Sequence, residues 1–581
     1  MRRFIATTLV AWAATAVQAE GLSIPNHNVD DFQSELRDNE NGTASALRAQ
    51  AVRDTAGKIY NEPRAWVIDG KPYPFCNGPV VRPGSLAASI VAKESQLLKS
   101  YSDTHAASYI QTAASITYKS VDDYLSFYDK IQTTLPRPMG SDISDETYGE
   151  QRLTILGFTL KTTSADSYAA ILEDVPDEQA ASVCGDFSTV ASLGQSERLL
   201  VSDFGDFAQW TDEKQKATKY APGTIGFFCF NEEKSQLLPL AIHIVDTNIT
   251  YTSADRLEEW TLAKMALTSV ELNFQQIWHF AETHATTSPI RVELMRNTAP
   301  THPINALLQH HFQVDSALEL AASIQLFNKS TAVDQTLAWG ATGSMRYLAH
   351  LFDKRMSMKN TFNADIKRLG NSLPRIHKYA QYGAMHHEAI ETFVREYLGA
   401  YYRDDFAVRG DRELNAWARA CAQIPHLADF PEKFENLEKL VQLVTHLVFT
   451  VTVKHHAMNG AVSWHMVSMP YSTPALWKPL PRSKLTKEDK LDLVEYTIPP
   501  TQIRGFIMLV SLFRRDLPHD RSLLEAYNVA PFKDEANLNN VIDRHMRNLQ
   551  SIENRISGQE NGQQWPYVVL KPSMLPYYSW I

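Results

Sequence analysis

The chain has 581 residues, of which 44% are hydrophobic and 21% are charged. This balance excludes a disordered or collagen-like protein, and the length suffices for a large buried core. The formal net charge is −10, so the surface does not attract polyanions and nucleic acid is not an expected partner. The four cysteines, Cys76, Cys184, Cys229 and Cys421, show no CxxC spacing, which argues against a zinc knuckle or a thioredoxin-type centre.

The first residues have the layout of a secretory signal peptide. Two arginines follow Met1, an almost uninterrupted apolar run extends from Phe4 to Val17, and small residues precede Glu20. The run is shorter than the ~20 residues that a membrane-spanning helix needs. No later segment has the pattern of a transmembrane helix. We therefore expect residues 1–19 to be cleaved and the protein to be secreted and soluble.

Three N-glycosylation sequons agree with export. Asn41, Asn248 and Asn328 each stand two residues before a serine or threonine. In an oxidising compartment the cysteines allow two disulfides, whose pairing the sequence does not give.

The pattern of apolar residues predicts a mainly α protein. Residues 20–75 are polar and are expected to form a surface extension, and the apolar spacing over 85–135 predicts helices. The runs 152–160 and 237–245 predict strands, and hence a minor β element. Beyond Ser253 helices are predicted over 255–286, 303–327, 386–402, 411–422, 432–459, 501–515 and 534–555. We find no repeat or flexible linker, which predicts one mature domain over 20–581.

Histidines on buried helices are the candidate functional residues. The predicted helix 432–459 is apolar on nearly every face between Leu440 and Val453, as is typical of a helix in the core of a large protein. His455 and Asn459 follow this stretch and are four residues apart, so both lie on one face and could share a metal ion. Taken singly, each histidine is more simply explained as a core residue bonded to backbone carbonyls.

The last residues add a possible carboxylate ligand. The chain ends in the apolar segment 576–581, which carries no charge before the terminal carboxylate of Ile581. We expect such a tail to dock inside the protein, where a metal cation would compensate the buried carboxylate. Imidazoles, an amide oxygen and one carboxylate suit non-haem iron or manganese, with a position left open for water.

These motifs resemble those of the lipoxygenases, most of all the secreted fungal manganese type. The resemblance runs from about Trp260 to Ile581. It rests on Trp260-x-x-Ala263-Lys264, His279-x-x-x-x-His284-Ala285, His302-Pro303-Ile304, Tyr401-Tyr402-x-Asp404-Asp405, Glu413-Leu414-x-x-Trp417, His455-x-x-x-Asn459 and the terminal Ile581. It implies a large helical catalytic domain without the N-terminal β-barrel of plant and animal members.

The resemblance implies a secreted non-haem metal dioxygenase. A bis-allylic hydrogen of a polyunsaturated fatty acid or related polyene would be removed, and O2 would add to the pentadienyl radical to give a hydroperoxide. The cofactor would be one manganese or iron ion, and the partners an unsaturated lipid and O2. We expect a monomer that can contact a membrane peripherally.

The resemblance does not decide which residue takes the place of the first histidine ligand. The family uses two histidines with four residues between them, a spacing that His279 and His284 match. In the register set by His302, however, His279 takes the place of the second histidine, and Phe274 or Gln275 that of the first.

Three alternatives follow for the metal site. It could use His279 without His284, with or without the amide oxygen of Gln275 as a further ligand. The helix could instead shift so that His279 and His284 form the pair, or the metal could bind too weakly for catalysis. The candidate ligands are His279, His284, His455, Asn459 and Ile581.

Arg504 is a candidate for substrate binding. It begins an apolar stretch that ends at Phe513, and a guanidinium at the edge of an apolar channel suits a fatty-acid carboxylate. It could equally cap its helix or pair with a nearby acid.

Two other functions remain open at this level. The protein could have altered chemistry on the same fold, isomerising or cyclising an oxygenated or polyene precursor. It could also be a non-catalytic relative that binds lipid.

Overall fold

The structure is a computed structural model. It describes residues 29–37, 43–59, 61–68, 71–79, 84–100, 105–131, 137–154, 159–212, 215–216, 218–322, 326–371, 373–459, 467–513, 517–529 and 531–580. The predicted signal peptide, the sequon at Asn41 and the terminal Ile581 lie outside the described residues.

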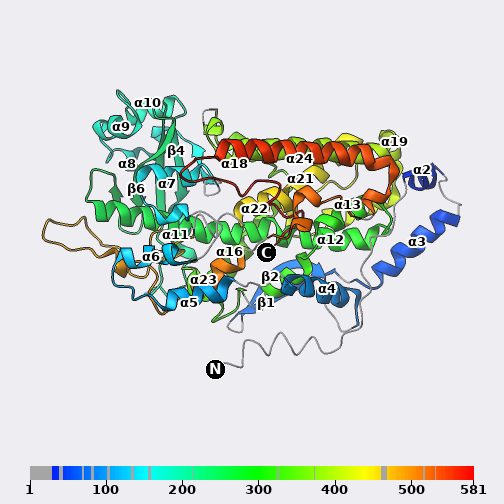
Figure 1. The fold of residues 1–581 in the computed structure, drawn as a ribbon, viewed down its shortest axis with the longest axis horizontal. Helices are drawn as coiled ribbons and strands as arrows, with labels where there is room; N and C mark the ends of the chain where they lie inside the picture. The colour runs from blue at the N-terminus through cyan, green and yellow to red at the C-terminus, as the bar shows by residue number, and fades with distance from the viewer. Residues whose placement is uncertain are drawn as a thin grey trace.

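Helices form most of the described chain, which confirms the predicted fold class (Figure 1). In the first part of the chain they are α2 (Val29–Arg37), α3 (Thr43–Ala56), α4 (Leu86–Ser100), α5 (His105–Ala114), α6 (Val121–Lys130), α7 (Asp145–Arg152), α8 (Ala169–Leu172), α9 (Asp177–Cys184) and α10 (Val190–Gln195). The central ones are α11 (Leu257–Glu282), α12 (His284–Asn297), α13 (Pro303–His311), α14 (Asp315–Ala321), α15 (Ala332–Thr336), α16 (Gly340–Lys354) and α17 (Phe362–Arg368). The remaining ones are α18 (Lys378–Tyr401), α19 (Asp405–Gly410), α20 (Arg412–Ala422), α21 (Leu437–Phe449), α22 (His455–Met458), α23 (Ile503–Phe513) and α24 (Asn539–Glu560).

Helix α11 passes through the middle of the molecule (Figure 1). Every residue from Glu259 to Asn273 is buried, as expected for a helix enclosed on all sides. Helices α18 and α24 run side by side along one flank, and α12 continues beyond α11 beneath them (Figure 1). The candidate functional residues therefore lie on helices at the centre of the molecule.

A five-stranded antiparallel sheet lies at one end of α11. Its strands, in spatial order, are β3 (Lys161–Thr162), β4 (Leu199–Phe204), β5 (Thr224–Asn231), β6 (Gln236–Ile244) and β7 (Ile249–Tyr251). Strand β6 confirms the prediction over 237–245. A disulfide between Cys184 and Cys229 joins α9 to β5.

The strand predicted over 152–160 is wrong at its start. Arg152 is the last residue of α7, and a turn follows it. Its fully buried guanidinium pairs with Glu271 of α11 and lies 3.5 Å from the ring centroid of Tyr148. These long-range contacts hold Arg152 in the helix and override the strand-like local pattern.

The N-terminal extension is partly helical and is docked on the helical body. In α2, Val29 and Phe32 are buried in the main hydrophobic core, and the ring of Phe32 packs edge-on against His302 and Tyr402. Beyond α3, strands β1 (Asn61–Ile68) and β2 (Lys71–Pro79) form an antiparallel pair.

Two predicted helices are interrupted near their histidines. The helix predicted over 255–286 divides into α11 and α12 at Thr283, where φ is −95° and ψ is −79°. The helix predicted over 432–459 begins at Leu437 as α21, then passes through a π-helical turn (Thr450–Lys454) into α22. The helix predicted over 303–327 also divides, into α13 and α14.

One further strand pair lies among the described residues. Strands β8 (Met356–Ser357) and β9 (Leu427–Ala428) form a short parallel pair. Among the helices of the described residues, none combines the length and the apolar character needed to cross a membrane.

Candidate metal centre

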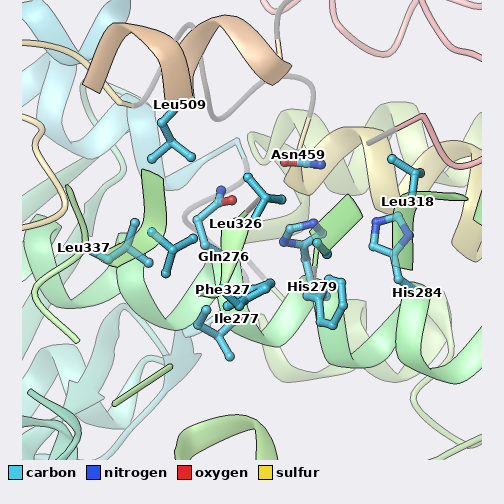
Figure 2. Close-up of a pocket in the computed structure, with 13 residues that line it drawn as sticks. Gln276, Ile277, His279, His284, Leu318, Leu326, Phe327, Leu337, Asn459 and Leu509 are labelled. Carbon is cyan, nitrogen blue, oxygen red and sulfur yellow. The ribbon is translucent and has the colours of Figure 1, made fainter. Parts of the chain in front are cut away.

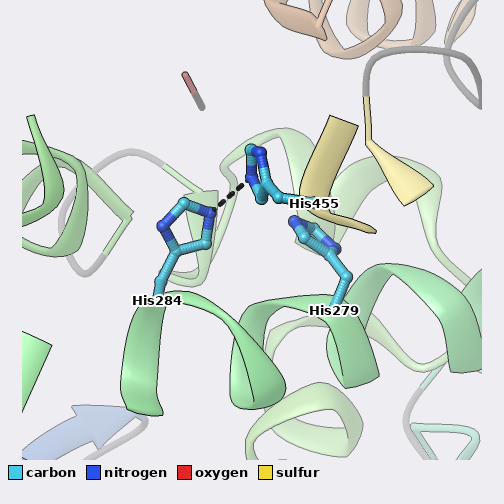
Figure 3. Close-up of side chains that lie close together, drawn as sticks. All are labelled: His279, His284 and His455. Carbon is cyan, nitrogen blue, oxygen red and sulfur yellow. Dashed lines mark hydrogen bonds between the residues drawn. The ribbon is translucent and has the colours of Figure 1, made fainter. Parts of the chain in front are cut away.

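Three histidines from separate helices meet in the core (Figure 3). His279 lies in the last turn of α11, His284 begins α12 and His455 begins α22. The Nε2 atoms of His284 and His455 are 3.0 Å apart, and one nitrogen from each of the three residues lies within 4.8 Å of the others. All three side chains are buried. One cation could bind all three imidazoles.

The interruption at Thr283 explains how His279 and His284 face the same point. In a continuous α-helix, residues five apart differ by about 140° in direction, because each residue turns by roughly 100°. Thr283 is a single turn residue with a distorted ψ of −79° between the two histidines, so the geometry of an ideal continuous helix does not hold across it. The helix before His455 is also irregular, because it contains the π-helical turn Thr450–Lys454. Such turns often occur at functional sites.

His279 lies in a dry environment that favours a neutral imidazole. Burial lowers the pKa of His279 to about 3, and the neighbouring His284 lowers it further. The Nδ1 atom of His279 is buried and has no hydrogen-bond partner of normal geometry among the described residues. Imidazoles whose nitrogens lie close together are good metal ligands, so the donor set fits a first-row transition metal such as iron or manganese.

Asn459 also belongs to this site. It follows α22, its backbone N–H donates to the carbonyl of His455 at 2.8 Å, and it lines the same pocket as His279 and His284 (Figure 2). Near the end of the described chain, the backbone N–H of Trp580 lies 3.3 Å from His456 Nε2. The residue before Ile581 is thus placed beside α22.

The geometry favours one of the three alternatives for the metal site. His284 lies beside His455, so His279 and His284 form the pair that the spacing suggested. Phe274 instead packs in an aromatic group with Phe204 and stacks on Trp278. Phe274 thus belongs to an aromatic group, whereas the part of the buried Gln275 as a further ligand stays a prediction.

An apolar pocket opens beside the histidines (Figure 2). Its volume is about 50 Å³, smaller than the roughly 300–1,000 Å³ that is usual for ligand sites. It is lined by Gln276, Ile277, His279, Phe280, His284, Leu318, Ala322, Leu326, Phe327, Val333, Leu337, Asn459 and Leu509. Such a lining suits a hydrocarbon chain.

A buried ionic cluster, missed by the sequence analysis, joins the two histidine-bearing segments. Lys454 Nζ lies 2.9 Å from Glu282 Oε1 and 2.8 Å from Asp365 Oδ2. It is also 5.2 Å from the ring centroid of Trp278. The signal was present in the sequence, because a lysine in an otherwise apolar buried helix must find a charged partner.

A second missed residue is Asp315, the first residue of α14. It is fully buried, and its Oδ1 lies 3.7 Å from His284 Nδ1. The carboxylate accepts a hydrogen bond from Thr287 Oγ1 at 2.7 Å and another from the Ser579 hydroxyl. Local sequence gave no signal for it, since Asp315 reaches His284 only through the packing of α14 on α12.

The other predicted site residues lie outside this centre. Arg504 is exposed on α23 and is not among the residues that line the pocket, although Leu509 of the same helix is. Its role as a carboxylate anchor stays a prediction. Asn248, in the turn between β6 and β7, and Asn328 are both exposed.

Comparisons with known proteins agree with the motifs. The sequence model of the Lipoxygenase family matches residues 177–577. A manganese lipoxygenase of Pyricularia oryzae is 26% identical over 498 residues, which are 79% of this chain and 78% of the relative. An allene oxide synthase-lipoxygenase protein of Plexaura homomalla is 27% identical over 375 residues, 62% of this chain but only 35% of that longer protein.

The same agreement extends to the fold. A solved structure of a manganese lipoxygenase superposes with a TM-score of 0.80 at 20% identity, covering 96% of this chain and 100% of the other. The superposition shows that the fold is shared, and the family match identifies the chain as a member of the lipoxygenase family of dioxygenases.

Proposed function

We propose that this protein is a non-haem metal dioxygenase that adds O2 to a polyunsaturated fatty acid or a related polyene and forms a hydroperoxide. The observation that carries the proposal is the convergence of His279, His284 and His455 beside an apolar pocket. Family membership supports the reaction class, and the manganese lipoxygenases among its relatives support the cofactor.

Manganese or iron would be held by His279, His284 and His455, with Asn459 and the carboxylate of Ile581 as further ligands. When bound, the metal supplies the one-electron redox chemistry of hydrogen abstraction. The protein's own contribution to the site is to bury the imidazoles and to hold them on helices that the tertiary structure fixes.

The pocket residues would position the acyl chain and exclude water. Phe280 and Phe327 pack with ring centroids 5.1 Å apart, and both line the pocket with Leu318. An acyl chain placed against these side chains gains roughly 25 cal/mol for each Å² of apolar surface removed from water. Exclusion of water also protects a radical from side reactions.

The first test is metal content together with oxygen uptake. We expect near-stoichiometric manganese or iron in the wild-type protein, and O2 consumption with linoleate. His284→Ala and His455→Ala should each lose most of the metal, while His350→Ala, a histidine on α16 outside the site, should keep it.

Each contrary result has a definite meaning. Full metal content in His284→Ala would contradict the pairing of His279 with His284. A metal-free wild-type protein that still binds linoleate would contradict the dioxygenase and support a lipid-binding role. Metal without O2 uptake, but with conversion of an oxygenated fatty acid, would support an isomerase.

We also propose that the protein is secreted, with residues 1–19 as its signal peptide. The disulfide between Cys184 and Cys229 suits an oxidising compartment, and the exposed Asn248 and Asn328 are accessible to glycosylation. Protein collected from the medium of a eukaryotic host should shift in gel mobility on deglycosylation. The shift should shrink in Asn248→Gln and Asn328→Gln, and an intracellular protein with no shift would contradict the proposal.

A further inference from the structure

Among the described residues that line the pocket, Gln276 is polar but is not a candidate metal ligand. Apart from His279, His284 and Asn459, which are candidate metal ligands, the other lining residues are all apolar. Gln276 lies on α11, three residues before His279, so the two side chains lie on adjacent turns of one face. Figure 2 shows its amide end among Leu326, Leu337 and Leu509.

The amide nitrogen of Gln276 lacks a partner. Gln276 Nε2 is shielded from solvent and donates to no acceptor among the described residues. Leaving a buried donor unsatisfied is unfavourable, and an aliphatic side chain of similar size would avoid this cost. A ligand oxygen in the pocket would satisfy the donor, and this gives the glutamine a physical reason to be there.

The pocket also limits the kind of oxygen that could accept this hydrogen bond. No lysine or arginine is among the described residues that line it, so a carboxylate beside Gln276 would have no cationic side chain to pair with, which disfavours it in an apolar site. The acceptor that fits is neutral. On a fatty acyl chain, a hydroxyl or hydroperoxide group supplies such an oxygen.

We propose that Gln276 is a specificity-determining residue that binds a neutral oxygen substituent on the acyl chain, so that the pocket prefers fatty acids already carrying a hydroxyl or hydroperoxide. This inference rests on the proposed function, because it assumes that the pocket holds an acyl chain. The oxygen could belong to the incoming substrate or to the hydroperoxide formed in the pocket. We assign it to the incoming substrate, and the experiment below distinguishes the two sources.

The test compares binding of linoleate with binding of a monohydroxy derivative whose hydroxyl stands next to the diene. Both are titrated anaerobically into the metal-containing protein, which prevents turnover. We expect wild type to bind the hydroxy acid at least fivefold more tightly than linoleate, a net gain of about 1 kcal/mol for one neutral hydrogen bond. Gln276→Met, which keeps the size and removes the donor, should abolish this preference, so that the two acids bind with equal affinity.

The control is Leu337→Met, which alters the same pocket without touching a donor and should keep the wild-type preference. Equal binding of the two acids by wild type would overturn the proposal, and so would a preference that survives in Gln276→Met. If the donor serves only the product, wild type will show no preference and Gln276→Met will change only the distribution of hydroperoxides formed from linoleate. Failure of the proposed function would appear separately, as absent O2 uptake with the binding ratio intact.

Discussion

Asp315 is the residue best placed to orient a candidate metal ligand. Its carboxylate faces His284 Nδ1, while His284 Nε2 faces His455. Metal-binding histidines commonly direct their second nitrogen toward a carboxylate, which fixes the ring and its tautomer. Thr287 and Ser579 hold the carboxylate in place, so Asp315 acts as a positioning residue behind the site.

Replacing Asp315 with asparagine should therefore weaken metal binding. We expect Asp315→Asn to lower metal affinity by about 10- to 100-fold, measured by competition with a chelator, and to change the electron paramagnetic resonance spectrum of bound manganese. The matched control is Glu319→Gln, which alters a buried carboxylate on the same helix that bonds to Ser288 instead. Equal metal affinities in Asp315→Asn and wild type would refute this role.

At the scale of elements, Lys454 connects the end of α11 to the π-helical turn before His455. Burial raises the pKa of Glu282 to about 7, although Lys454 opposes this change. Burial alone would lower the pKa of Lys454, but Asp365 and Glu282 outweigh it and hold this pKa above its ordinary value. The cluster thus keeps a buried ammonium charged between two acids, and it fixes the relative positions of two histidine-bearing elements.

Removing this lysine should destabilise the fold. Lys454→Met would leave Glu282 without its cation and Asp365 with only Arg368 as a partner, and we expect it to lower the free energy of unfolding by about 3–5 kcal/mol, measured by urea denaturation. The combined variant Lys454→Met, Glu282→Gln, Asp365→Asn should recover most of the loss, because it leaves no buried acid unpaired and the Arg368 side chain is partly exposed. Lys478→Met breaks an exposed pair with Glu495 and should cost no more than about 1 kcal/mol. A loss in Lys454→Met as small as that of the surface control would contradict the prediction.

At the scale of the whole molecule, buried neutral histidines make stability depend on pH. Burial lowers the pKa of His386 to about 4, although a hydrogen bond to the Leu570 carbonyl at 2.7 Å raises it. Burial likewise lowers the pKa of His377 and His545 to about 3 each. Between these values and the ordinary pKa of 6.5, the unfolded chain binds protons that the folded protein does not. Stability is therefore complete above that pKa and falls as the pH decreases toward about 4.

This dependence can be measured histidine by histidine. We expect the free energy of unfolding to fall by roughly 1.4 kcal/mol per pH unit for each such histidine. His386→Gln should reduce the slope of unfolding free energy against pH by up to the contribution of one proton, roughly 1.4 kcal/mol per pH unit. His519→Gln, at an exposed position, should leave the slope unchanged. Denaturant unfolding measured at several pH values checks this, and an identical slope in His386→Gln and wild type would exclude His386 as a contributor.

The secondary structure predicted from the sequence is correct where the local pattern of residues and the tertiary packing favour the same element. The helix α11 and the strand β6 follow from their apolar patterns, because both are buried where the pattern predicted. Arg152 shows the opposite case. The residues that follow Arg152 have the pattern of a strand, but the pairing of Arg152 with Glu271 across the core keeps Arg152 in α7. A contact between residues so far apart in the sequence cannot be predicted from the local pattern.

The sequence by itself determined the helical class, the family and the residues able to hold a metal, because these depend on residue type and spacing along the chain. Only the tertiary structure decided that His284 joins His279 and His455. That outcome depends on the distorted backbone at Thr283 and on the π-helical turn that ends at Lys454. Local propensity does not encode either feature, since packing between distant helices selects them.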